Sequence, residues 1–77
     1  MHKFYLEFIL NTYDDSGEAL KKVLSGLGAD LEFLPMPQID SERGRHFKIQ
    51  ISAEDPTVIF DTCAEFGRIK SVKVDES

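Results

Sequence analysis

The chain contains little cysteine, no tryptophan and no long hydrophobic run, and these scarcities exclude several classes of protein. Its 77 residues include one cysteine, Cys63, so no disulfide can form within the chain and a reducing compartment is expected. The apolar stretch near the N-terminus is interrupted by Glu7. It is therefore too short to span a membrane and lacks the continuous apolar core of a signal peptide. We expect a cytoplasmic protein that does not bind membranes.

Basic residues are also scarce. Nine Lys and Arg stand against fourteen Asp and Glu, which gives a formal net charge of −5. Binding to nucleic acids is driven by Lys and Arg that neutralise phosphates, so no nucleic-acid partner is expected. With 42% hydrophobic and 30% charged residues, the composition is typical of a globular protein. The length predicts one domain over residues 1–77, and a domain this small often gains stability by forming a homodimer.

Two elements are predicted in the first third of the chain. Apolar residues alternate from Phe4 to Leu10, which predicts a half-buried strand. A helix follows, with Asp15 or Ser16 as its N-cap and Gly28 as its left-handed C-terminal residue. Its predicted buried stripe has the spacing of one helical face and consists of Leu20, Val23, Leu24 and Leu27.

The rest of the chain predicts two more strands, a second helix and a last strand. A strand over Asp30 to Pro35 is expected at a sheet edge, because Pro35 and Pro37 cannot donate ladder hydrogen bonds. The pair Asp55-Pro56 is a typical helix start. The predicted elements are a strand over Phe47 to Ile51, a helical stripe of Ile59, Phe60, Cys63 and Phe66 that ends at Gly67, and a strand with Val72 and Val74.

This order of elements, β-α-β-β-α-β, predicts an α+β fold of the ferredoxin-like plait. Right-handed crossovers give a four-stranded antiparallel sheet of order 4-1-3-2, with both helices on one face. The inner sheet face is predicted to hold Phe4, Leu6, Phe8, Phe47, Ile49, Ile51, Val72 and Val74. The outer face is predicted to show Tyr5, Glu7, Ile9, Lys48, Gln50 and Lys73.

The segment Asp14-Asp15-Ser16-Gly17-Glu18 is the candidate ligand site. Glycine at position 17 would let a ligand approach the backbone, and the carboxylates of Asp14, Asp15 and Glu18 would receive an ammonium group. The positive end of the helix dipole adds an attraction for anions. The alternative reading is a negatively charged helix cap with a turn glycine.

Two segments resemble parts of an ACT-type regulatory domain. The first consists of Asp15-Ser16-Gly17-Glu18-Ala19-Leu20-Lys21-Lys22-Val23-Leu24 and Leu27-Gly28-Ala29-Asp30-Leu31-Glu32, and the second is Glu65-Phe66-Gly67-Arg68-Ile69-Lys70-Ser71-Val72. Ser16 stands where the family often has proline, and Leu20 comes three residues after Gly17 rather than two. The resemblance implies a regulatory module that binds an amino acid or similar metabolite at Asp15 and Gly17. It also implies a dimer interface, with residues 31–34 of a second subunit completing the site.

Catalytic, metal and cofactor sites are not expected. Cys63 lies on an apolar helical stripe and is interpreted as a small core residue. His2 and His46 have no metal-ligand spacing, and His46 is expected to be solvated near the edge of the outer face. The alternative to ligand sensing is a ligand-free interaction or assembly module of the same fold. It would use an edge strand, or an outer-face patch around Tyr5 and Ile9.

Overall fold

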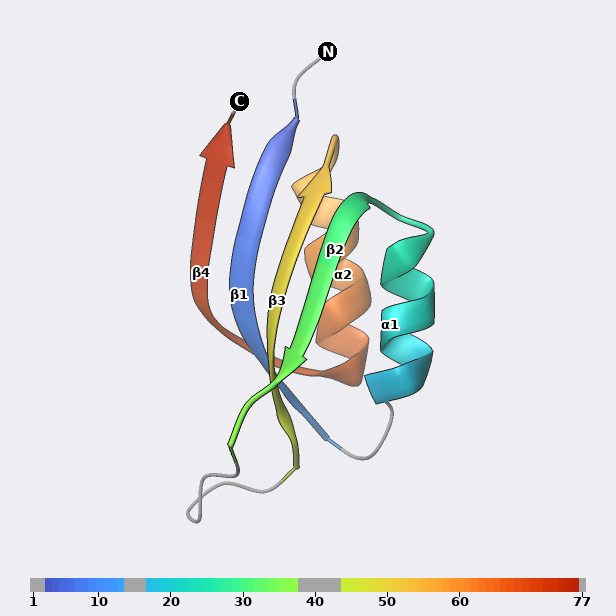
Figure 1. Ribbon diagram of the computed structural model, residues 1–77, viewed down its shortest axis with the longest axis vertical. Coiled ribbons are helices and arrows are strands. Elements are labelled where there is room, and N and C mark those ends of the chain that lie inside the picture. Colours follow the sequence, from blue (N-terminus) through green and yellow to red (C-terminus); the bar gives the residue numbers. More distant parts are fainter. Residues whose placement is uncertain (1–2, 14–16, 38–43, 77) are drawn as a thin grey trace.

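The computed structural model describes residues 3–13, 17–37 and 44–76, and within them the chain forms an α+β fold. The elements are β1 (Phe4–Thr12), α1 (Gly17–Ser25), β2 (Ala29–Pro35), β3 (His46–Ala53), α2 (Pro56–Phe66) and β4 (Gly67–Glu76). The strands pair antiparallel in the order β2-β3-β1-β4, which is the predicted order read from the opposite edge. Both helices lie on one side of the sheet (Figure 1). Neither of them has the length and apolar character needed to cross a membrane.

The second helix begins and ends where the sequence predicts. The carboxylate of Asp55 accepts a hydrogen bond from the Thr57 N–H at 3.0 Å, and Pro56 opens the first turn. Gly67 ends the helix, with its N–H donated to the Cys63 carbonyl. These are the two backbone requirements of a helix end, a cap for free N–H groups and a partner for free carbonyls.

The predicted end of α1 is wrong. The helix stops at Ser25, and Gly28 is not left-handed, because Gly44 is the one glycine with positive φ in the described part of the chain. Strand β3 instead lies close to Gly28. A Cβ at this position would be 2.6 Å from the Ser52 carbonyl oxygen and 2.8 Å from the Ile51 side chain. The predicted N-cap residues, Asp15 and Ser16, lie outside the described residues.

The hydrophobic core fills the space between the sheet and the two helices. Its buried members are Leu6, Phe8, Leu10, Leu20, Leu24, Phe47, Ile49, Ile51, Ala53, Ile59 and Cys63. The ring of Phe8 meets that of Phe60 edge-on, with centroids 5.4 Å apart. Such edge-to-face pairs are a favoured aromatic geometry and anchor α2 against the central strand β1.

The edges of the core are more exposed than the sequence pattern predicts. Val23 and Leu27 are 42% and 38% exposed, since α1 turns mainly Leu20 and Leu24 toward the sheet and Leu27 lies beyond its end. Val72 and Val74 are also about half exposed, at 48% and 47%. They belong to the outermost strand, β4, which the helices leave largely uncovered (Figure 1).

Both edge strands contain a bulge. In β2 the pairing with β3 shifts between Ala29 and Glu32, and in β4 the pairing with β1 shifts opposite Glu7 and Ile9. Each bulge holds a residue with positive φ, Asp30 at 55° and Ser71 at 54°. Bulges bend a strand and interrupt its ladder, which protects an open edge from pairing with another chain.

Substitution of Gly67 tests the packing at the end of α2. A Cβ on Gly67 would meet the carbonyl oxygen of Asn11 and lie 2.7 Å from Cα of Thr12, both backbone atoms that cannot rotate away. We expect Gly67→Ala to lower the free energy of unfolding by about 1–3 kcal/mol, as overpacking does elsewhere. The measurement is urea unfolding followed by circular dichroism.

The control is Gly26→Ala. The nearest atom to a Cβ at Gly26 is the Val23 carbonyl oxygen at 3.5 Å, which is ordinary contact. This variant is expected to be neutral or slightly more stable, because alanine restricts the unfolded chain. Equal losses in the two variants would contradict the packing explanation.

Candidate functional site

A hollow of about 420 Å³ lies at the start of α1. Its lining brings the predicted site residues Gly17 and Glu18 together with residues distant in the sequence; it consists of Gly17, Glu18, Lys21, Phe33, Pro35, Arg45 and Phe47. The other two predicted site residues, Asp14 and Asp15, lie outside the described residues. We call this feature the α1 hollow.

Two aromatic rings form the apolar part of the α1 hollow. Phe33 of β2 and Phe47 of β3 have ring centroids 4.6 Å apart and planes tilted by 37°. Antiparallel pairing of β2 with β3 brings them together, since Phe33 lies opposite Ile49 and Pro35 lies opposite Phe47. The sequence predicts Phe47 as a core residue, and its exposed fraction is 8%. Its contribution to the hollow depends on strand register and is not visible in any local motif.

Gly17 has a packing role in the α1 hollow. It is buried, and a Cβ added to it would lie 2.8 Å from Cζ of Phe47. The aromatic ring therefore occupies the space that a larger side chain at this position would need. This contact accounts for glycine at the first residue of α1 without reference to a ligand.

Charges of both signs surround the two rings. Glu18 contributes a carboxylate from the first turn of α1, and Lys21 and Arg45 contribute cations; all three side chains are exposed. The first turn of a helix also carries N–H groups without helical partners and a partial positive charge. The α1 hollow therefore offers both an anionic and a cationic contact beside an apolar surface.

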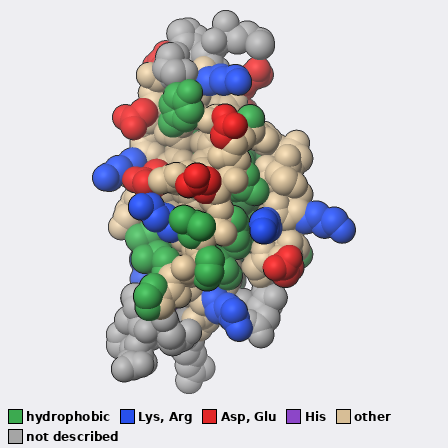
Figure 2. Space-filling model, viewed as in Figure 1, with side chains coloured by type: hydrophobic (Ala, Val, Ile, Leu, Met, Phe, Trp, Pro, Cys, Tyr) green, Lys and Arg blue, Asp and Glu red, His purple; other side chains and the backbone are tan. Residues whose placement is uncertain are grey.

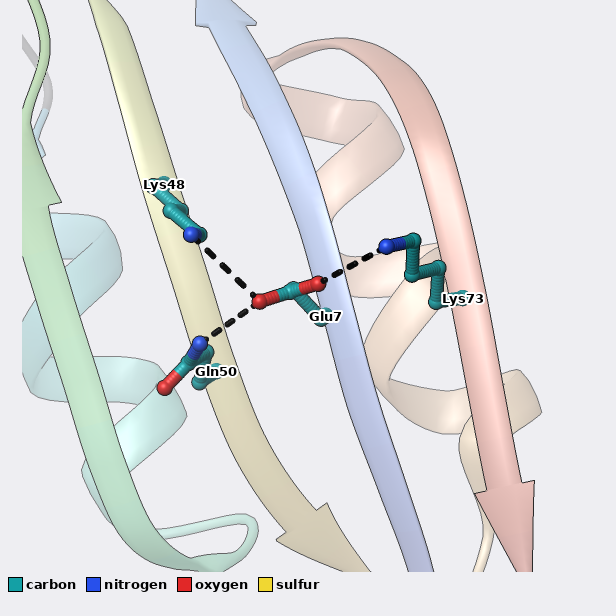
Figure 3. A network of polar contacts seen from close by, with 4 residues as sticks. All are labelled: Glu7, Lys48, Gln50 and Lys73. Carbon is teal, nitrogen blue, oxygen red and sulfur yellow. Dashed lines mark hydrogen bonds and ion pairs between the residues drawn. The ribbon is translucent and has the colours of Figure 1, made fainter.

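A polar network occupies the opposite, outer face of the sheet (Figure 3). The Glu7 Oε1 atom accepts a 2.7 Å hydrogen bond from Gln50 Nε2 and lies 3.5 Å from Lys48 Nζ. The Lys73 Nζ atom lies 3.8 Å from Glu7 Oε2. The Gln50 hydrogen bond, followed by the nearby lysine charges, lowers the pKa of the Glu7 carboxyl group below its ordinary value. A hollow of about 370 Å³ adjoins this network between Tyr5, Asp30 and Asp75.

Two other reactive side chains are buried. His46 is 3% exposed, so the prediction that it is solvated is wrong. It begins the central strand β3, opposite Asn11 of β1, and its carbonyl accepts the Met36 N–H at 2.8 Å. Cys63 is fully buried, as predicted for a core residue, and burial raises the pKa of its thiol to about 12. Across the described ranges, no three His, Cys, Asp or Glu side chains form a group able to hold a metal ion.

Comparisons with known proteins give no relative for this chain. No protein-family model matches the sequence, and no curated protein or solved structure matches it. The resemblance to ACT-type domains therefore stays a prediction. The α1 hollow and the outer face of the sheet are the features from which a function is inferred.

A paired substitution tests the packing role of Gly17. Gly17→Ala is expected to lower the free energy of unfolding by about 1–3 kcal/mol, because the new Cβ collides with the Phe47 ring. In a Phe47→Leu background the same change is expected to cost measurably less, and the difference is the coupling energy of the pair. Denaturant unfolding of the unaltered chain, the two single variants and the double variant gives this coupling energy. Equal costs in both backgrounds would show that the ring does not set the requirement for glycine.

The Glu7 network predicts a ranked set of pKa changes. A carboxyl group with a lowered pKa stabilises the fold above its ordinary pKa, and this stabilisation is lost as the pH falls through the lowered value. Carbon-detected NMR titration is expected to show a larger rise in the Glu7 pKa in Gln50→Ala than in Lys73→Ala, since the hydrogen bond is the strongest influence. A larger rise in Lys73→Ala would contradict this geometry.

Proposed function

We propose that this chain is a small, non-enzymatic regulatory module that binds an amino acid or a similar zwitterion in the α1 hollow. Its architecture supports a ferredoxin-like plait, and its first helix begins with the residues that resemble an ACT-type domain. The observation that carries the proposal is the pairing of an aromatic floor, Phe33 and Phe47, with exposed charges of both signs. A zwitterion with a side chain is the class of ligand that uses all of these contacts.

The proposed contacts follow from charge and polarity. The ammonium group of the ligand lies toward the Glu18 carboxylate, and its carboxylate lies toward Lys21, Arg45 and the N-terminal end of α1. Its apolar portion covers the two rings. A volume of about 420 Å³ is within the range of small-ligand pockets. The described lining contains no histidine, cysteine or serine, which favours binding over catalysis.

The α1 hollow is formed within one chain. The resemblance assigns residues 31–34 of a second subunit to the ligand site, but Phe33 and Pro35 of the same chain already line this hollow. We therefore expect ligand binding by each protomer, whether or not a homodimer forms. This separates the ligand proposal from the question of assembly.

A thermal-shift screen against the twenty amino acids tests the proposal. A ligand that binds only the folded state stabilises it by about 2.7 kcal/mol at roughly 100 times its Kd, enough to raise the Tm of a domain this small by about 10 °C or more. We expect Glu18→Gln and Lys21→Gln each to reduce that shift, since each removes one charge from the rim of the α1 hollow.

The matched control is Glu65→Gln. Glu65 is an exposed glutamate of α2 and does not line the α1 hollow, so its replacement should leave the ligand shift unchanged. Gly17 is unsuitable as a probe of binding, because substitution there disturbs Phe47. The absence of any shift across the screen, or an equal loss in all three variants, would overturn the proposal.

A second candidate function is a ligand-free interaction or assembly module. The observation that favours it is the exposure of large apolar side chains on the outer face, where Tyr5 and Leu34 are both 51% exposed. Partner-binding surfaces often combine such side chains with a polar surround. This candidate predicts association without any effect of amino acids on the Tm.

A further inference from the structure

The outer face of the sheet is the surface that the helices leave open. Strand register defines its rows: Tyr5 lies level with Ser52 and Asp75, and Glu7 lies level with Gln50, Lys73 and Glu32. The next two rows centre on Ile9 and Asn11, and the Asn11 row includes His46, which is buried, so this row is only partly open. Figure 2 shows this face, with most acidic side chains over the upper half of the sheet.

The charges of the outer face are balanced, although the chain as a whole carries −5. Among the described residues that pair across this face, together with the adjoining Asp30, there are four acids and four bases; they are Glu7, Asp30, Glu32, Asp75, Lys48, Arg68, Lys70 and Lys73. The apolar side chains of Tyr5, Ile9 and Leu34 lie among them. Two copies of an acidic protein repel each other, and this repulsion is smallest when they meet through a neutral, partly apolar face.

The balanced charges are unequally placed along the strands. The rows of Tyr5 and Glu7, with the adjoining Asp30, hold all four acids and one lysine, and we call this the acidic end. The rows of Ile9 and Asn11 hold the other three cations, and we call this the basic end; these cations are Lys48, Arg68 and Lys70. Counted by row, with carboxylates and Lys/Arg fully ionised, the face carries about −3 at one end and about +3 at the other. The ion pair between Lys48 and Glu7 joins the two ends and reduces each net charge to about 2.

From this pattern we infer that the outer face binds a second copy of this chain, face to face and with the strands of the two sheets running in opposite directions. A two-fold axis in the plane of the interface and perpendicular to the strands places each acidic end over the partner's basic end. A two-fold axis parallel to the strands would instead place like charges over each other. The charge distribution thus favours the axis perpendicular to the strands over the axis parallel to them.

The two edges of the sheet are less suited to self-association. The edges of β2 and β4 are interrupted by the bulges at Asp30 and Ser71, and β2 ends at Pro35, so pairing along an edge is obstructed. The aromatic residues that line the α1 hollow, Phe33 and Phe47, lie on the core side of the sheet and not on its outer face. A face-to-face dimer consequently leaves the hollow open, and the inference stands apart from the ligand proposal.

The size of the outer face predicts a weak, reversible dimer. Four strands spaced about 4.8 Å apart, and seven residues rising about 3.3 Å each, give a face of roughly 19 by 23 Å. This area is at the low end for specific interfaces, where association is transient. The monomer and dimer are therefore expected to exchange, with the dimer favoured by protein concentration and weakened by salt.

Two charge-reversal variants test the inference. Glu32→Lys/Asp75→Lys makes the acidic end positive, and Lys70→Glu/Arg68→Glu makes the basic end negative; all four positions lie on the outer face. In analytical ultracentrifugation each variant alone is expected to show a dissociation constant at least about tenfold above that of the unaltered chain, because like charges now meet. An equimolar mixture is expected to regain the dimer, since each altered end then faces an opposite charge.

The control is Asp61→Lys/Glu65→Lys on α2, which changes the net charge by the same amount as the first variant but leaves the outer face intact. It is expected to dimerise as the unaltered chain does. Circular dichroism verifies that every variant is folded. The inference is overturned if the unaltered chain stays monomeric at all concentrations. It is equally overturned if the α2 control loses the dimer as the face variants do, or if the mixture fails to regain it. None of these outcomes changes the increase in Tm that an amino acid bound in the α1 hollow is expected to cause.

Discussion

The alternation of side chains along β1 is the constraint on which the rest of the structure depends. This strand pairs with β3 on one side and β4 on the other, and it turns Leu6, Phe8 and Leu10 into the core. Burying each such side chain is worth about 1.5–3 kcal/mol, so the three together match a large part of the stability of a typical domain. A shift of the register by one residue would move all of them into solvent. The same alternation places Glu7 and Ile9 on the outer face, and so fixes both surfaces at once.

The parts of the fold that depend on local rules could be predicted from the sequence. The strand at Phe4, the start of α2 at Asp55-Pro56 and its end at Gly67 follow from periodicity, capping and helix termination. Features that depend on how much of a residue's surface is covered by neighbouring elements could not be predicted from the sequence. Val72 lies in a part of the edge strand β4 that the helices leave largely uncovered. His46 is buried although Lys48, on the same face of the same strand, is exposed. The positive φ angles in the two bulges belong to Asp30 and Ser71 rather than to glycines, so no sequence signal predicts them.

The candidate site shows the same division. Gly17 and Glu18 were accessible to sequence reasoning because they lie at a helix start. Phe33 and Arg45 were not predicted as site residues, since their places depend on contacts between distant segments. The pairing of β2 with β3 brings Phe33 beside Phe47, and the Thr12 N–H donates to the Arg45 carbonyl at the end of β1. The structure also changes the interpretation of Gly17, whose missing side chain makes room for Phe47. The chemistry of the α1 hollow is therefore assigned to its charged rim and its two rings rather than to the glycine turn.

The burial of Cys63 has a consequence for following the motions of this molecule. It is the only cysteine in the chain, it is fully enclosed between α2 and the sheet, and its raised pKa keeps it in the unreactive thiol form. A thiol reagent can reach it only when α2 separates from the sheet or the whole domain unfolds. The rate of labelling therefore reports the frequency of that opening, and its dependence on denaturant separates a local separation of the helix from complete unfolding. Cys63 is thus a natural probe of the packing between α2 and the sheet.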